Sequence, residues 1–116
     1  MPELNAKTVE ESQATMKDKF PTMVQYFIED TTTYINNIQE GLAEKSASKV
    51  KSPAHTIKSS AKLFGASKIS ELAEKIEHLA CDIEEGKETD LEKVTPVFEE
   101  LKKAYSEAEP ELKSLL

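Results

Sequence analysis

The sequence predicts an all-α protein, an antiparallel up-down four-helix bundle with an additional short amino-terminal helix. Three observations support this fold class. Apolar residues recur at helical spacing along most of the chain, and no segment alternates as a strand would. Only three glycines interrupt the 116 residues. The connections between the helical segments are short, so consecutive helices are expected to be antiparallel neighbours.

The first two helices are predicted from a capping signal, a proline and an apolar stripe. Thr8, followed three residues later by a glutamate, resembles a capping box that opens a short helix over about residues 8–20. Pro21 suits the first turn of a second helix. The stripe of that helix consists of Val24, Phe27, Ile28, Ile35, Ile38 and Leu42. Gly41 is expected to weaken its end, and residues 45–47 form the predicted connection.

The third helix is predicted to have one buried face and one exposed face. Its apolar residues are spaced by four, three, four and three positions, which places them on one side. They are Val50, Ala54, Ile57, Ala61 and Phe64. His55 lies about 200° around the helix from Ile57 and is therefore expected to face solvent. Gly65 is the predicted helix stop.

The rest of the chain is predicted to form two further helices and a loosely held tail. The fourth helix, with Ser67 as a possible cap, ends at Gly86. Its buried residues are Ile69, Leu72, Ala73, Ile76, Leu79 or Ala80, and Ile83. A second capping-box pattern, Thr89 with Glu92, opens a fifth helix through Leu91, Val94, Phe98, Leu101 and Tyr105. We expect one domain over residues 1–116, with the bundle over about 21–107 and the tail over about 108–116.

Two prolines leave a choice open. Pro53 and Pro96 both fall inside patterns that otherwise predict continuous helix, where proline removes a hydrogen bond and clashes with the preceding turn. Each helix is either kinked at its proline or begins there. For the third helix, Ser52 would cap a helix that begins at Pro53. A kink is favoured, because Val50 already belongs to the apolar stripe.

Charge is distributed unevenly along the chain. The sequence has 22 acidic residues and 15 lysines, with no arginine, and a net charge of −7. The segment 45–70 nevertheless contains no carboxylate. Its six lysines surround His55: Lys45, Lys49, Lys51, Lys58, Lys62 and Lys68. The overall acidic charge and the absence of arginine argue against a nucleic-acid binder.

The remaining composition indicates a protein that needs neither an oxidising compartment nor a membrane. The single cysteine, Cys81, cannot form an internal disulfide. No apolar run approaches the length of a membrane span. The amino terminus lacks the basic and apolar regions of a secretory signal. We therefore expect a cytoplasmic protein.

The segment 55–66, HTIKSSAKLFGA, resembles the signature of histidine-containing phosphotransfer (HPt) domains, which work in multistep phosphorelays. That signature has a histidine, any residue, an aliphatic residue, a lysine, two small residues and later Gly-Ala. Ser59 stands where the family usually has the first glycine. Serine is still small enough for a partner to approach the histidine, and the change bears on partner choice.

The resemblance implies that His55 is the phosphoacceptor and that Lys58 neutralises charge on the phosphoryl group. A phosphoryl group would come reversibly from a receiver-domain aspartyl phosphate and pass to another receiver. The implied partners are response-regulator receiver domains and hybrid sensor histidine kinases. No cofactor is expected here, because in the family Mg²⁺ belongs to the receiver. No autonomous kinase activity is expected either, because the sequence has no glycine-rich nucleotide motif. The expected docking residues are Lys51, Ser59 and Lys62, with Met16 or Phe20 of the first helix.

Other classes of helical bundle fit the residues less well. The alternative function is a non-catalytic adaptor that binds receiver or kinase domains without phosphotransfer, but such a copy would be expected to have lost its histidine or lysine. A di-metal bundle needs Glu-x-x-His pairs. At that spacing His55 is preceded by Ser52, and His78 is preceded by Lys75. No apolar stripe remains beyond those that the core requires, so we expect a monomer.

Overall fold

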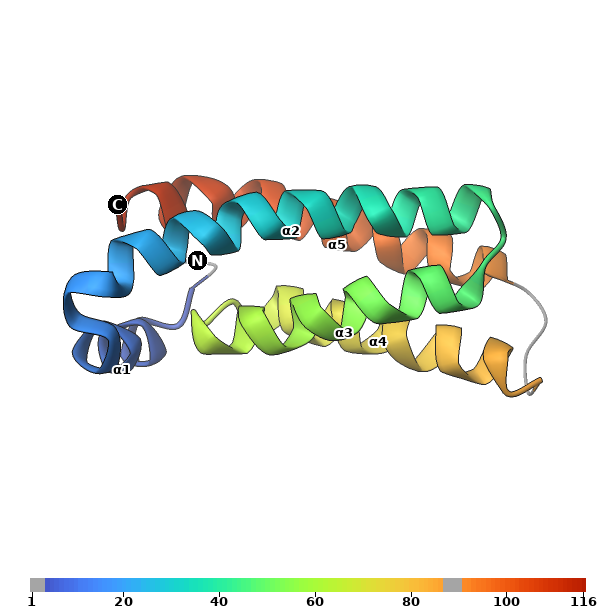
Figure 1. The fold of residues 1–116 in the computed structure, drawn as a ribbon, viewed down its shortest axis with the longest axis horizontal. Coiled ribbons are helices and arrows are strands. Elements are labelled where there is room, and N and C mark those ends of the chain that lie inside the picture. Colours follow the sequence, from blue (N-terminus) through green and yellow to red (C-terminus); the bar gives the residue numbers. More distant parts are fainter. Residues whose placement is uncertain (1–3, 87–90) are drawn as a thin grey trace.

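The computed structural model describes residues 4–86 and 91–116, and every regular element in these ranges is helical. The α-helices are α1 (Ala6–Met16), α2 (Phe20–Ala43), α3 (Ala47–Leu63), α4 (Ser67–Glu84) and α5 (Val94–Lys113). Short 3₁₀ helices at Lys17–Lys19 and Leu91–Lys93 precede α2 and α5. Four helices, α2 to α5, run along the long axis, while α1 lies at one end of the bundle (Figure 1). The predicted fold class is confirmed.

Helix α1 begins earlier than predicted, and its cap is Asn5 rather than Thr8. The Asn5 side-chain oxygen accepts a hydrogen bond from the Thr8 backbone N–H at 3.1 Å. Thr8 is already inside the helix, so it cannot form a capping box there. The Asn5 backbone N–H also donates to the Gly65 carbonyl at 2.8 Å, and the Ser12 hydroxyl donates to the Leu63 carbonyl at 2.5 Å. These bonds attach α1 to the end of α3.

The junction between α1 and α2 is a break in the backbone and not a continuation of α1 to residue 20. Helix α1 ends at Met16, and Lys17 has a positive φ of 52°. After the 3₁₀ turn, α2 begins at Phe20 with Pro21 in its first turn. Proline is tolerated there because its missing N–H would have no partner within the helix. The predicted place of Pro21 is confirmed.

The core fixes the orientation of α3. The five residues of its predicted stripe are at most 4% exposed: Val50, Ala54, Ile57, Ala61 and Phe64. The Phe64 ring packs against Phe20 and Phe27 of α2, with ring centroids 6.1 and 5.0 Å away. Burial of this apolar surface is the main favourable contribution to folding. It holds the opposite face of α3 toward solvent.

Gly41 does not end α2, which continues to Ala43. It is buried against the start of α3, where an added Cβ would lie 2.9 Å from Val50 Cγ2 and 3.1 Å from the backbone carbon of Lys49. Glycine therefore allows the two helices to approach closely. The connection to α3 is short, and Ser46 caps α3 by accepting a hydrogen bond from the Lys49 backbone N–H.

The two prolines occupy different helical positions. Helix α3 is one element from Ala47 to Leu63, so the alternative in which it begins at Pro53 is wrong. Pro96 is the third residue of α5, where no intrahelical partner exists for a backbone N–H. It therefore marks a helix start and not an interior kink.

The capping-box prediction at Thr89 falls outside the described residues. Helix α4 begins at Ser67 itself, with Ala66 at the cap position.

The segment predicted to be a loose tail is helical and partly buried. Helix α5 continues through Pro110 to Lys113, and Ala108 and Leu112 are completely buried. The prediction placed a loosely held tail over about residues 108–116, a segment that includes Pro110. An interior proline costs about 3 kcal/mol, but burying a leucine side chain contributes about 1.5–3 kcal/mol. Core contacts from Ala108 and Leu112 thus offset the proline.

No helix within residues 4–86 and 91–116 combines the length and the apolar character that crossing a bilayer requires.

Candidate functional site

His55 lies on the exposed face of α3, as predicted. Its side chain is 60% exposed, while Ala54 and Ile57 beside it are completely buried. The ring is thus held on a rigid, well-packed helix but remains accessible to another molecule. Ser59, one turn further along, is also exposed, and its hydroxyl donates to the His55 carbonyl at 3.3 Å.

Helices α3 and α4 are joined by polar contacts along one side of α3. Near the turn, the Ser70 hydroxyl donates to the Lys58 carbonyl at 2.9 Å. At the far end, Lys51 Nζ lies 3.0 Å from Glu84 Oε2. Because the two helices run antiparallel, residues early in α4 meet residues late in α3. This register brings Glu77, in the middle of α4, opposite His55.

Glu77 contacts both residues that the sequence assigns to phosphotransfer. One carboxylate oxygen lies 2.5 Å from His55 Nδ1, and the other accepts a hydrogen bond from Lys58 Nζ at 2.6 Å. The Glu77 side chain is only 13% exposed and that of Lys58 is 22% exposed. The three side chains form a connected group that links α3 to α4, which we call the His55–Glu77–Lys58 cluster.

The charge state of Glu77 decides which nitrogen of His55 is reactive. Burial raises the pKa of Glu77, but the hydrogen bonds and charges of Lys58 and His55 outweigh burial and hold the pKa below its ordinary value. Glu77 is therefore a carboxylate near neutral pH and can only accept hydrogen bonds. His55 Nδ1 must carry the shared hydrogen, so the lone pair of the neutral ring is on Nε2.

The lysines around His55 differ in how freely they can meet a partner. Lys58 is held by Glu77, and Lys51 is held by Glu84, whose hydrogen bond and charge raise the pKa of Lys51. Lys62 is exposed and has no carboxylate within 4.0 Å among the described residues. Of the three predicted docking residues, Ser59 and Lys62 are thus exposed, whereas Lys51 is engaged in an ion pair.

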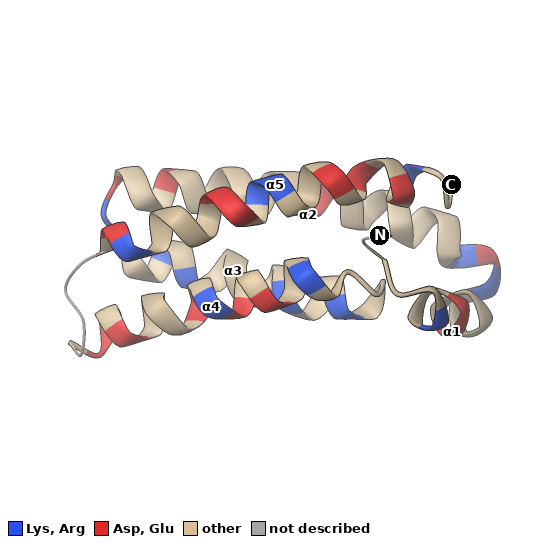
Figure 2. Cartoon of the chain, turned by 180° about the vertical axis from the view of Figure 1, so that it is seen from behind, with Lys and Arg blue, Asp and Glu red and all other residues tan. Residues whose placement is uncertain are grey.

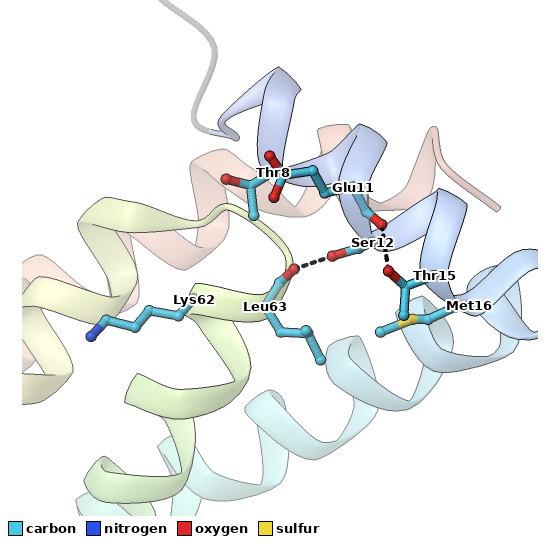
Figure 3. Close-up of a pocket in the computed structure, with 7 residues that line it drawn as sticks. All are labelled: Thr8, Glu11, Ser12, Thr15, Met16, Lys62 and Leu63. Carbon is cyan, nitrogen blue, oxygen red and sulfur yellow. Dashed lines mark hydrogen bonds between the residues drawn. The ribbon is translucent and has the colours of Figure 1, made fainter.

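Met16 and Phe20, the two docking residues expected from the first helix, lie in different environments. Phe20 is 3% exposed and belongs to the core, so its predicted place in a docking surface is wrong. Met16 is partly buried and lines a groove of about 240 Å³ between α1 and the end of α3 (Figure 3). Lys62 and Leu63 form the α3 side of the same groove.

The charged residues are divided between the helices. Helix α3 carries four lysines and no carboxylate, whereas α2 carries three carboxylates and no lysine. In the view from behind, α4 and α5 each carry both acidic and basic segments (Figure 2), so the separation of charge is confined to α2 and α3. Four of the six lysines of the basic segment found in the sequence therefore lie on α3, the helix that carries His55. Its charge is partly compensated by α4 through Glu77 and Glu84.

The second histidine is separate from this cluster. His78 is 68% exposed and lies 3.8 Å from Glu74. Over the described parts of the chain, no three side chains among histidine, cysteine, aspartate and glutamate gather in a way that could hold a metal ion.

The model of the Hpt domain family matches residues 22–111. The chain belongs to the Hpt domain family. The match extends from the first turn of α2 to the last turn of α5 and includes the complete His55–Glu77–Lys58 cluster. Family membership supports a histidine phosphotransfer role in phosphorelays.

A solved structure supports the same fold. Histidine-containing phosphotransfer protein B (HptB) from Pseudomonas aeruginosa PAO1 superposes with a TM-score of 0.87 at 18% sequence identity. The match covers 97% of this chain and 93% of that chain, so it includes α1 as well as the bundle. Comparison with curated protein sequences gave no significant match.

Sequence reasoning missed Glu77 in this Hpt domain. The segment around His55 contains no carboxylate, so the residues near it in the sequence gave no sign of an anionic partner. A usable signal was present in α4, because Ser70, Ala73 and Glu77 are spaced by three and four positions and share one face. Two of these residues, Ser70 and Ala73, are buried. A glutamate that continues a buried face is expected to point toward the neighbouring helix and to have a cationic partner there.

Proposed function

We propose that this Hpt domain accepts a phosphoryl group on Nε2 of His55 from the aspartyl phosphate of a receiver domain and passes it to another receiver. One observation carries the proposal: the Glu77 carboxylate lies 2.5 Å from Nδ1 of exposed His55. A carboxylate there favours the hydrogen on Nδ1 and leaves Nε2 as the nucleophile. Membership of the Hpt domain family supports the general role. The assignment to His55 and the receiver partners are our proposal.

The proposed step is a displacement at phosphorus. The lone pair of Nε2 forms the new N–P bond while the P–O bond to the receiver aspartate breaks, and its electrons remain on the aspartate carboxylate. Positive charge develops on the imidazole ring, whose hydrogen stays on Nδ1. The Glu77 carboxylate, 2.5 Å from Nδ1, stabilises that charge. The reverse sequence of bond changes returns the phosphoryl group to a receiver.

Lys58 has two roles in this proposal. Its ammonium group compensates the charge of partly buried Glu77, and an ammonium group has three hydrogens to donate. It lies one helical turn from His55, so it can share its hydrogens between Glu77 and the oxygens of an incoming phosphoryl group. The Lys58–Glu77 bond therefore holds the cation at the site before the phosphoryl group arrives.

In the proposed reaction the receiver domain and this Hpt domain contribute different groups. The receiver would contribute the Mg²⁺ ion and the aspartate, and hybrid sensor histidine kinases would supply receivers of this kind. The carboxylate-free surface of α3 suits a partner with an acidic phosphorylation pocket. We also propose that the protein acts as a cytoplasmic monomer, which sedimentation and cell fractionation can test.

The test is phosphoryl transfer from a panel of phosphorylated receiver domains to the parent protein and to the variant His55→Gln. His78→Gln is the matched control, because it removes the other exposed histidine. We expect acid-labile, base-stable label on the parent and on the control, and none on His55→Gln. Receivers that bind the parent but never label it would indicate a non-catalytic adaptor. Label that persists on His55→Gln would contradict the assignment of the phosphoacceptor.

A further inference from the structure

Ser70 is a buried polar residue at the contact between α3 and α4. It is only 3% exposed, and its hydroxyl donates to the Lys58 backbone carbonyl at 2.9 Å. The two helices lie side by side (Figure 1). The bond therefore reaches from the first turn of α4 to the backbone of the helix that carries His55.

The hydroxyl of Ser70 constrains the contact more strictly than its neighbours on α4 do. Ile69, Leu72 and Ile76 are also buried, but their side chains are apolar. Apolar contacts are not directional, so they tolerate a small rotation of one helix against the other. A hydrogen bond requires a defined length and angle, and a buried hydroxyl that loses its partner is costly because no water replaces it. The Ser70 bond therefore favours one orientation of α4.

The turn between the two helices does not determine that orientation by itself. It consists of residues 64–66, so it is too short for α4 to slide far along α3. Rotation of α4 about its own axis is still allowed. A rotation of about 20° moves a group about 6 Å from the axis by about 2 Å, and a hydrogen bond does not survive a change of that size. Contacts between side chains of the two helices therefore depend on what fixes the rotation.

Glu77 lies on the same face of α4 as Ser70. Seven residues separate them in the sequence, equivalent to about 10 Å along the helix and about 20° around it. Both contact Lys58, Ser70 at the carbonyl and Glu77 at Nζ, 2.6 Å away. The long side chains of Glu77 and Lys58 can follow a rotation by changing rotamer. The short Ser70 side chain and a backbone carbonyl cannot, so their bond fixes one helix relative to the other.

We propose that Ser70 is a positioning residue for phosphotransfer, because its bond to the Lys58 carbonyl fixes the rotation of α4 and holds the Glu77 carboxylate against Nδ1 of His55. Ser70 is buried and acts through Glu77, which lies 2.5 Å from Nδ1. Without the bond, α4 would adopt other rotations and the hydrogen would be shared between the two ring nitrogens. The effect on transfer rests on the proposed function, whereas the position of the hydrogen can be measured without a receiver.

Two variants remove the bond in different ways, and a third is the matched control. Ser70→Ala deletes the hydroxyl. Ser70→Cys stays close to serine in size but offers only a weak donor, which separates the bond from packing. The control is Tyr105→Phe, because the buried Tyr105 hydroxyl of α5 also donates to a backbone carbonyl of another helix, that of Ile28 on α2, at 2.9 Å. Urea unfolding measures the stability that each variant loses.

The decisive measurement is the position of the hydrogen on the His55 ring. Long-range ¹H–¹⁵N NMR of protein labelled in its histidine side chains distinguishes Nδ1–H from Nε2–H, and exposed His78 is an internal reference. We expect Nδ1–H in the parent and in Tyr105→Phe, and a mixture in both Ser70 variants. With a receiver that labels the parent, transfer should be about 5-fold slower in the Ser70 variants and parental in Tyr105→Phe.

The outcomes separate positioning from the proposed function. A His55 ring that keeps Nδ1–H in both Ser70 variants would overturn the inference, whatever any receiver does. Equal changes in Tyr105→Phe would also overturn it, because Ser70 would then act only through the stability of the bundle. A redistributed hydrogen with a parental transfer rate would refute the role of Ser70 in phosphotransfer. A redistributed hydrogen, with no receiver able to label the parent, would support the positioning of Glu77 and overturn the proposed function.

Discussion

Glu77 of α4 lies 2.5 Å from Nδ1 of His55 on α3, although 22 residues separate them in the sequence. The same carboxylate binds Lys58, so one partly buried group organises both residues of the phosphotransfer motif. The contact sets the hydrogen on Nδ1 and leaves Nε2 free to react. It also means that the site depends on the register between two helices as well as on the motif itself.

Replacing Glu77 by glutamine should slow phosphoryl transfer to His55 without unfolding the bundle. Glutamine keeps the shape of the side chain but cannot stabilise positive charge on the ring, so we expect about a 10-fold lower rate, equivalent to about 1.4 kcal/mol in the barrier. Rapid-quench measurements with a phosphorylated receiver give the rate. Glu74→Gln, which lies near surface residue His78, is the control.

The pH dependence of the transfer rate distinguishes two roles for Glu77: positioning the His55 ring, or only supporting the contact between α3 and α4. If Glu77 acts through the charge and tautomer of His55, the pH profile of transfer should move in Glu77→Gln relative to the parent. An identical profile with a uniformly lower rate would indicate that Glu77 only supports the helix contact.

Lys58 and Lys51 should respond differently to substitution by alanine. Lys58→Ala removes the cation that shares Glu77 with His55, so transfer should slow by about 10-fold or more. Lys51 lies one turn before His55, is paired with Glu84 and has no contact with the His55–Glu77–Lys58 cluster. Lys51→Ala should therefore transfer at the parental rate in the same quench experiment. Equal losses in the two variants would show that general positive charge on α3 matters more than the contact with Glu77.

Acid should weaken the connection between α3 and α4 that passes through Glu77. Burial raises the pKa of this carboxyl, but Lys58 and His55 hold it below the ordinary value of 4.5. Because the pKa is lower in the folded state, the resulting stability is complete above the unfolded value and is lost as the pH falls through the folded value. Urea unfolding should therefore show the parent losing its advantage over Glu77→Gln as the pH falls below 4.5 and through the lowered pKa of Glu77. A difference that does not change with acidification over the range in which both proteins stay folded contradicts this assignment.

The end of α5 should contribute to stability, contrary to its prediction as a loose tail. Leu112 is completely buried, so Leu112→Ala should lower the free energy of unfolding by about 2–5 kcal/mol. Leu116 is 53% exposed, and Leu116→Ala should unfold within about 0.5 kcal/mol of the parent. Denaturant unfolding of the two variants makes the comparison. Two equally small effects would mean that α5 frays beyond Pro110 in solution.

The sequence was most informative where the relevant interactions are local. The 3.6-residue period placed Ala54 and Ile57 in the core and His55 in solvent, because the side of a helix follows directly from residue spacing. The Gly65 turn was also predictable, and its φ of 74° is one that glycine adopts without strain. The motif then identified His55 and Lys58 as candidates.

The features that were missed depend on contacts between distant segments. Glu77 reaches His55 only because of the register between α3 and α4, and local spacing does not define that register. Pro110 stays inside α5 because Leu112 is buried by other helices, although local propensity favours a stop. The α1 cap was misassigned because Asn5, three residues before Thr8, supplies the oxygen that accepts the Thr8 N–H.

The most direct test of the central claim is to identify the phosphorylated atom. The protein, labelled with ¹⁵N in its histidine side chains, is phosphorylated by a receiver domain, and phosphorus–nitrogen couplings are measured by NMR. The geometry of the His55–Glu77 contact predicts coupling to Nε2 of His55, with the hydrogen retained on Nδ1. Phosphorus on Nδ1, or on any residue other than His55, would contradict the proposed role of Glu77 and the account of the site built upon it.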